Sequence, residues 1–219
     1  MISRAMEDYL KVLSQLHQEN QSASTNDVAL AMGVSPASAT NMLKKLADTN
    51  LVIYTPYRGA SLTKSGEKAA LEIIRHHRLL ELYLNEALGV PWDEVHEEAE
   101  KLEHVISEEL EERIANYLGN PTTDPHGHPI PARDGSVIEP KLKSLADLQS
   151  GETATIKRVP DKDPNILRYL GELRMRPGTK VHMLEKAPFN GPLTVKIYGE
   201  AKSLGAELAA KVFVGKESV

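Results

Sequence analysis

The sequence of 219 residues contains no cysteine. This absence excludes disulfide bridges, thiolate metal ligands and a cysteine nucleophile. No apolar run approaches the roughly 20 residues that a membrane-spanning helix needs, and the first four residues lack the apolar core of a signal peptide. Neither a G-x-S-x-G pattern nor a P-loop occurs. We therefore expect a cytoplasmic protein with no membrane partner and no thiol chemistry.

Acidic side chains are concentrated in one part of the chain. The formal net charge is −5, from 26 Lys and Arg against 31 Asp and Glu. Residues 1–70 carry 7 basic and 6 acidic side chains, residues 71–140 carry 5 and 16, and residues 141–219 carry 14 and 9. The acidity thus belongs to the middle segment. Because a DNA-binding surface needs only a local basic face, the net charge does not exclude nucleic acid as a partner.

The N-terminal part predicts a pair of helices before residue 33. Apolar residues recur at helical spacing over residues 4–18. Ser24 and Asp27 form a capping-box pattern that opens a second helix over Thr25–Met32. Gly33 ends that helix, because glycine readily takes the left-handed conformation of a C-terminal cap.

The next segment completes a helix-turn-helix pattern and adds a hairpin. Ser35 is a good N-cap, and Pro36 fits the first helical position of a helix that runs to about Thr49. Two short β-type runs follow, at residues 51–54 and 60–63, separated by a turn. A hairpin directly after a helix-turn-helix predicts a winged helix-turn-helix.

The polar face of the second motif helix suits the major groove of DNA. Short polar side chains near a helix N-terminus can reach base edges, while basic side chains contact phosphates. The alternative left open is a solvated helix face that binds nothing. The candidate DNA-binding residues are Ser35, Pro36, Ser38, Thr40, Asn41, Lys44 and Arg58.

Long helices and an irregular connector are predicted for the middle of the chain. A helix capped by Thr63 or Ser65 reaches about Leu88, and another spans residues 92–118. Residues 120–140 are rich in proline and glycine, which predicts a connector without regular structure.

The last part of the chain alternates β-type runs with turns and two short helices. This pattern predicts a small β-barrel of roughly 70 residues. The expected strands are 154–159, 180–184, 193–198 and 211–214, and the expected helices are 165–170 and 204–209.

Histidine and glutamate side chains recur at helical spacing in the acidic segment. His96, Glu100, Glu103 and His104 stand at i, i+4, i+7 and i+8, so a continuous helix would carry all four on one face. His77 and Glu81 form another i, i+4 pair on the preceding helix. Imidazole and carboxylate ligands without sulfur suit Mn²⁺ or Fe²⁺. The alternative is a solvated face, since residues 93–112 hold ten acidic side chains.

Two enzyme classes are tested by the same spacing. His96-Glu97-Glu98-Ala99-Glu100 resembles the H-E-x-x-H zinc protease motif, but glutamate replaces its last histidine. Di-iron carboxylate bundles need Glu-x-x-His pairs, and Lys101 stands three residues before His104. We therefore expect no enzyme, with a metallohydrolase as the alternative from another class.

The order of the parts resembles the diphtheria toxin repressor family over essentially the whole chain. The motifs that carry the resemblance are Met6-Glu7-Asp8-Tyr9-Leu10, Val34-Ser35-Pro36, Tyr57-Arg58-Gly59, His77-Arg78-Leu79-Leu80-Glu81, His96-Glu97-Glu98-Ala99-Glu100, Glu103-His104 and Pro125-His126-Gly127-His128-Pro129-Ile130-Pro131. The resemblance implies a mainly α-helical protein with a small β part. Its expected domains are a winged helix-turn-helix (1–72), a helical metal-binding and dimerisation domain (73–140) and an SH3-like, FeoA-like barrel (145–219).

The resemblance also implies two metal sites per subunit. It assigns Asp8, Glu100, Glu103 and His104 to the site that switches DNA binding. It assigns His77, Glu81 and His96 to an ancillary site, which Asp161 would complete from the barrel. Asp124 stands where some relatives place an extra ligand, and we interpret His126 and His128 as structural loop residues.

Two positions indicate which metal the family resemblance implies here. Iron-responsive relatives carry cysteine in place of Glu100 and methionine in place of Asp8, whereas this chain has carboxylates at both, which favours Mn²⁺ over Fe²⁺. Lys11 replaces an acidic ligand of the short manganese-responsive members, so we expect two separate sites instead of a binuclear one. The implied protein is a homodimeric, metal-activated repressor that binds double-stranded DNA.

Overall fold

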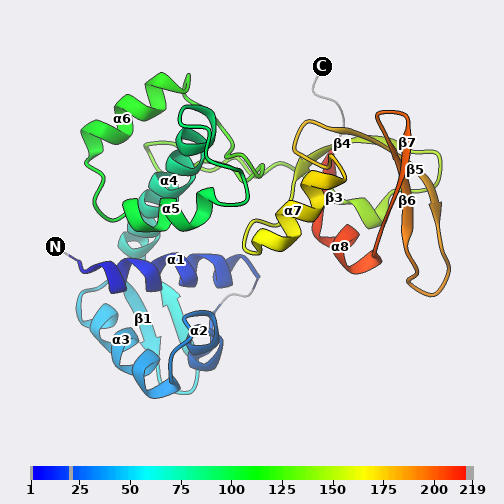
Figure 1. Cartoon of the computed structure of the whole chain (residues 1–219). Coiled ribbons are helices and arrows are strands. Elements are labelled where there is room, and N and C mark those ends of the chain that lie inside the picture. The colour runs from blue at the N-terminus through cyan, green and yellow to red at the C-terminus, as the bar shows by residue number, and fades with distance from the viewer. Residues whose placement is uncertain (1, 20–21, 216–219) are drawn as a thin grey trace. The chain divides into compact units, whose positions relative to one another are not determined.

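The computed structural model describes residues 2–19 and 22–215 (Figure 1). Its contacts divide the chain into two units, which are described separately. Unit 1 comprises Met1–His77, Lys101–Glu111 and Pro131–Val137, and unit 2 comprises Arg78–Glu100, Glu112–Ile130 and Ile138–Val219. Among the described residues, no helix is long and apolar enough to cross a membrane.

Unit 1 contains a three-helix bundle followed by a β-hairpin. Its elements are α1 (Arg4–Glu19), α2 (Thr25–Ala31), α3 (Pro36–Asp48), β1 (Val52–Thr55) and β2 (Gly59–Leu62). The two strands pair antiparallel, and they follow α3 directly. The winged helix-turn-helix prediction is confirmed. One apolar cluster joins these elements, with Leu10, Leu13, Leu43 and Leu46 fully buried.

Local capping explains where the helices of this motif begin. Ser24 and Asp27 form the expected capping box at the start of α2. Ser35 accepts a hydrogen bond from the Ser38 backbone N–H, and Pro36 occupies the first helical position of α3. At Gly59 an added Cβ would lie 2.4 Å from the Ala23 carbonyl oxygen, and φ is +98°, so only glycine fits there.

Helix α4 (Lys64–Glu86) contributes residues to both units and is capped by Thr63, whose hydroxyl accepts from the Gly66 N–H. The single helix expected over 92–118 is wrong. The structure has α5 (Val95–Leu102) and α6 (Glu108–Tyr117), with a turn between them. Ser107 starts α6, since its hydroxyl accepts from the Leu110 N–H.

Unit 2 contains one six-stranded antiparallel sheet. Its strands are β3 (Lys143–Ser144), β4 (Thr153–Arg158), β5 (Lys180–Lys186), β6 (Leu193–Ile197), β7 (Glu200–Leu204) and β8 (Phe213–Gly215). The order is β3-β8-β4-β5-β6-β7, so β3 and β7 are edges. The expected small β domain is present, but among the described residues its sheet is open and does not close into a barrel.

Helices and apolar side chains complete the C-terminal part of unit 2. Helices α7 (Pro164–Glu172) and α8 (Ala206–Lys211) lie where two short helices were expected, together with a 3₁₀ turn at Leu145–Asp147. The core is one cluster around Leu145, Ile156 and Val195. The connector over residues 120–140 has neither helix nor strand, as expected.

Candidate metal centre

The first group of metal-ligating side chains lies in unit 1. Asp8, on α1, meets Glu103 and His104 from the turn after α5, and one ligand atom of each lies within 4.8 Å of the others. His104 Nε2 is 2.9 Å from Asp8 Oδ1 and 3.3 Å from Glu103 Oε1. His104 Nδ1 lies 2.6 Å from Glu7 Oε2, which orients the ring so that Nε2 faces the two carboxylates.

Two cationic or hydrogen-donating groups surround the carboxylate of Glu103. Lys11 Nζ donates to Glu103 Oε1 at 2.6 Å, and His77 Nδ1 contacts Oε2. The Glu103 side chain is fully buried. Burial alone would raise the pKa of Glu103, but the hydrogen bonds and charges of His77 and Lys11 outweigh it and lower this pKa below its usual value.

The pKa of Asp8 is shifted in the opposite direction to that of Glu103. Its partial burial raises the pKa of the Asp8 carboxyl above the usual value, although His104 and Lys11 oppose that shift. Two adjacent carboxylates with opposite pKa shifts, beside an imidazole, form a compact set of oxygen and nitrogen donors that suits a divalent cation.

Glu100 belongs to the last turn of α5, in unit 2. Its carboxylate Oε1 lies 3.9 Å from His96 Nε2, and half of the side chain is exposed. The four residues predicted on one helix face are therefore split. His96 and Glu100 lie in α5, whereas Glu103 and His104 lie in the turn beyond its end.

A second group of candidate ligands lies in unit 2 around Glu81. Glu81 Oε1 is 3.1 Å from His96 Nδ1, and Glu81 Oε2 is 3.9 Å from His126 Nδ1. His77 precedes Glu81 by one turn of α4, so both start from the same face of that helix. His126 Nε2 is 2.8 Å from the Trp92 carbonyl oxygen.

The connector loop places Asp124, a predicted candidate ligand, beside His126 and His128, which the sequence did not indicate as ligands. Asp124 Oδ1 accepts hydrogen bonds from the backbone N–H groups of His126 and His128. His128 Nδ1 lies 3.6 Å from Asp124 Oδ2 and 3.5 Å from Asp161 Oδ2. Asp161, expected beside the ancillary set, thus groups with Asp124 and His128. The Asp124-x-His-x-His spacing was the signal that could have revealed these histidines.

The donor atoms of this loop have the chemistry of a metal site. Asp124 Oδ2, His126 Nδ1 and His128 Nδ1 are buried and form no hydrogen bond within the described part of the chain. Buried polar atoms almost always have partners, so atoms left over in one place indicate a ligand. Burial would lower the pKa of His128, but the carboxylates of Asp124 and Asp161 outweigh it and raise this pKa.

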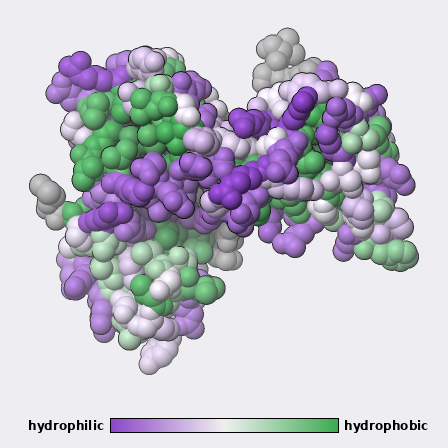
Figure 2. Space-filling model, in the orientation of Figure 1, coloured by the Kyte–Doolittle hydropathy of each residue, from purple (hydrophilic) through white to green (hydrophobic). Residues whose placement is uncertain are grey.

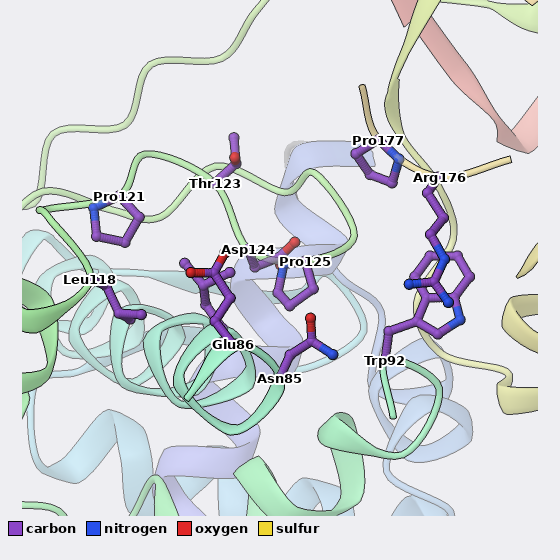
Figure 3. A pocket seen from close by; sticks show the side chains of 11 residues that line it. Asn85, Glu86, Trp92, Leu118, Pro121, Thr123, Asp124, Pro125, Arg176 and Pro177 are labelled. Carbon is purple, nitrogen blue, oxygen red and sulfur yellow. The ribbon is translucent and has the colours of Figure 1, made fainter. Parts of the chain in front are cut away.

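A cavity of about 390 Å³ reaches the same carboxylate in unit 2. Asp124 is one of its lining residues (Figure 3). On another wall the guanidinium of Arg176 lies 4.6 Å from the centre of the Trp92 ring. The full lining consists of Leu82, Asn85, Glu86, Trp92, Leu118, Pro121, Thr123, Asp124, Pro125, Arg176 and Pro177.

The candidate DNA-binding residues lie on the surface of unit 1. Ser35, Pro36, Ser38, Asn41 and Lys44 are exposed along α3, and Thr40 is half-buried. Arg58 is exposed at the tip of the hairpin, beside a fully exposed Tyr57 with φ +64°. The Ser35 hydroxyl accepts the Ser38 N–H, so its main role is to start the helix.

Helix α6 presents apolar side chains to solvent. Leu110 is 50% exposed and Tyr117 is 70% exposed. Figure 2 shows a hydrophobic area over the region that α6 occupies in Figure 1. An exposed apolar helix face of this kind is typical of a protein–protein interface.

Family models match almost the whole chain. Residues 1–60 match the N-terminal DNA-binding domain of iron-dependent repressors, and residues 63–132 match the metal-binding and dimerisation domain of the same repressors. Residues 143–216 match the FeoA domain.

Curated proteins and solved structures agree with these matches. The iron-dependent repressor IdeR of Mycobacterium leprae is 30% identical, with 96% of each chain covered. The regulator MntR of Bacillus subtilis is 34% identical over 54% of this chain and 82% of its own. A manganese-dependent transcriptional repressor solved in complex with manganese has a TM-score of 0.88 and 39% identity, covering 97% of this chain and all of that one.

These relatives are transcriptional repressors and not enzymes, which rules out the metallohydrolase alternative. The matched domains account for the winged helix-turn-helix, the ligand-bearing helices and the open sheet. The chain belongs to the diphtheria toxin repressor family of metal-dependent, DNA-binding transcriptional repressors.

Proposed function

We propose that Mn²⁺ activates this repressor at a centre formed by Asp8, Glu103 and His104. The observation that carries the proposal is the 2.9 Å approach of His104 Nε2 to Asp8 Oδ1. Asp8 belongs to the helix that packs against the DNA-binding motif, whereas His104 follows α5. A metal centre at this point would fix α1 to the turn that carries Glu103 and His104.

The ligand chemistry supports Mn²⁺ over Fe²⁺. Carboxylate oxygens and one imidazole make a hard donor set, and the chain has no cysteine to favour a softer ion. Among the similar structures, one is described as a manganese-dependent repressor in complex with manganese and another as ScaR with bound Cd²⁺. Comparing the DNA affinity that each ion induces under anaerobic conditions separates Mn²⁺ from Fe²⁺.

The chain's own residues explain how metal binding would reach DNA. A divalent cation at this centre would draw Asp8, Glu103 and His104 to one point. Asp8 is followed on α1 by Leu10 and Leu13, which are buried against Leu43 and Leu46 of α3 in one cluster. Fixing α1 therefore fixes the recognition helix. Two such helices in a dimer must match half-sites about one helical turn, roughly 34–36 Å, apart.

We also propose a second metal centre around Glu81 and Asp124 in unit 2. Its donors form two groups that share Asp124: Glu81, Asp124 and His126 in one, and Asp124, His128 and Asp161 in the other. His77 and His96, which the family resemblance places with Glu81, are further candidates. The buried donor atoms of Asp124, His126 and His128 that form no hydrogen bond support this assignment. The centre would join helix α4 to the connector and to the end of β4.

We infer the domain organisation and the binding partners from the matched family domains. We propose a DNA-binding domain over 1–72, a metal-binding and dimerisation domain over 73–140 and an SH3-like domain over 145–219. The exposed apolar side chains of α6 support a homodimer, and the exposed polar side chains of α3 support a double-stranded operator.

The experiment that tests the switch is a DNA mobility shift with and without Mn²⁺. Glu103→Gln should abolish the metal dependence, because it removes a buried ligand charge while keeping the side-chain shape. Glu97→Gln, an exposed residue of α5, is the matched control and should behave as the unchanged protein. DNA binding that is independent of metal in all three proteins would contradict the proposal.

A further inference from the structure

The carboxylate of Glu103 is held by a lysine from the same helix that carries Asp8. Lys11 stands three residues after Asp8 on α1, so the helix presents a carboxylate and an ammonium group to one point. The Lys11 Nζ–Glu103 Oε1 distance is 2.6 Å, and only 11% of the Lys11 side chain is exposed. A buried lysine normally requires such a partner.

The contact places the positive charge of Lys11 on the carboxylate of Glu103, which is a proposed metal ligand. Lysine carries three N–H donors and no acceptor, so Lys11 cannot itself ligate a cation. Glu103 is fully buried, which weakens solvent screening between charges around it. An ion that binds Glu103 through Oε1 must displace the ammonium group, and an ion that binds elsewhere on Glu103 must remain beside a second positive charge.

We propose that Lys11 is an internal competitor of the divalent ion at Glu103 and thereby sets the metal concentration at which the repressor responds. This inference rests on the proposed function, since it takes Glu103 as a ligand. In the opposite role, Lys11 would orient Glu103 for the metal. The two roles predict changes of opposite sign when the lysine charge is removed.

The test is the dissociation constant of Mn²⁺ without DNA, measured in competition with a fluorescent chelator. Lys11→Met and Lys11→Gln both remove the charge, and glutamine keeps an N–H donor for Glu103. Changes beside metal ligands typically alter affinity by about 10–100-fold, and we expect tightening on that scale in both variants. Lys11→Arg keeps the charge and should stay close to the unchanged protein.

Two controls separate competition from other effects. Lys68→Met removes one positive charge from an exposed position of α4 in the same unit, and its affinity should not change. Thermal unfolding in the presence of chelator identifies any variant that does not fold. Lys11→Gln and Lys11→Met measure the effect of the lysine charge independently.

The outcomes distinguish the inference from the function on which it rests. Weaker binding in Lys11→Met with unchanged binding in Lys11→Gln would mean that Lys11 orients Glu103, which overturns the inference. Unchanged or weaker binding in both variants overturns it too. If Glu103→Gln leaves Mn²⁺ affinity unaltered in the same assay, the proposed metal centre itself fails.

Discussion

At the scale of single residues, the two side-chain oxygens of Asp124 have different surroundings. Oδ1 accepts the N–H groups of His126 and His128 and so shapes the loop. Oδ2 forms no hydrogen bond within the described residues, although it is buried, and lies 3.6 Å from His128 Nδ1. Oδ2 also lies 3.8 Å from Arg78 Nε. Because this buried oxygen has neighbours of opposite charge but no hydrogen bond in the described part of the chain, it is suited to hold an ion.

Asp124→Asn should therefore lower the number of bound Mn²⁺ ions from two to one per subunit. The amide keeps an oxygen acceptor for the two loop N–H groups but loses the negative charge that an ion requires. Mass spectrometry under non-denaturing conditions or equilibrium dialysis measures the count. Glu103→Gln should remove the other ion, and Asp134→Asn, an exposed loop residue in unit 1, should remove neither. Two ions retained by Asp124→Asn would contradict the second centre.

At the scale of elements, helix starts were predictable because their signals are local. Ser24 and Ser35 cap helices where the sequence placed them. The break between α5 and α6 was missed, because histidine and glutamate continue the helical spacing across it. Ser107 before three acidic residues in the first turn was the overlooked signal. Strands β3 and β7 were missed because short edge strands have little apolar alternation.

The candidate sites were only partly predictable for a related reason. Helical spacing identified Glu103 and His104 correctly as neighbours, but their meeting with Asp8 depends on contacts between residues nearly 100 positions apart. The resemblance to a family supplied that pairing. Neither spacing nor resemblance assigned His126 and His128, because a Pro- and Gly-rich loop has no periodicity from which side-chain directions follow.

The connector loop should depend on the lack of a side chain at Gly127. Its φ is +90°, and an added Cβ would lie 1.8 Å from the Lys157 carbonyl oxygen of β4. Gly151 has a similar φ of +88° but open space, so it is the matched control. Left-handed backbone costs a non-glycine residue about 1–2 kcal/mol, which we expect for Gly151→Ala.

Gly127→Ala should lower the free energy of unfolding by about 1–3 kcal/mol more than that, because the clash is with rigid backbone. Urea unfolding in the presence of chelator measures both variants. Equal losses for the two alanines would show that the loop moves away from β4 without cost, and so would weaken the view that β4 positions His126 and His128.

At the scale of the whole molecule, the proposed switch makes metal and DNA act on one equilibrium between forms that are competent to bind DNA and forms that are not. An ion that favours the competent arrangement raises the apparent DNA affinity only through the fraction of molecules it recruits. The molecule needs no contact between ion and DNA for this coupling. Repression by such a protein increases with metal concentration, because the ion binds the form that is competent to bind DNA more tightly than the other forms.

Linkage makes this coupling testable from dissociation constants alone. If Mn²⁺ tightens DNA binding by some factor, DNA must tighten Mn²⁺ binding by the same factor, typically about 5–150-fold in coupled systems. The four dissociation constants are measured with a selected DNA fragment at one salt concentration, since phosphate contacts make DNA affinity salt-dependent. The protein concentration is kept above that of dimer dissociation. We expect the two factors to agree in the unchanged protein and to fall close to one in Glu103→Gln.

A metal-induced gain in DNA affinity with no reciprocal gain in Mn²⁺ affinity would mean that the ion changes the amount of dimer instead of the arrangement of its winged helices.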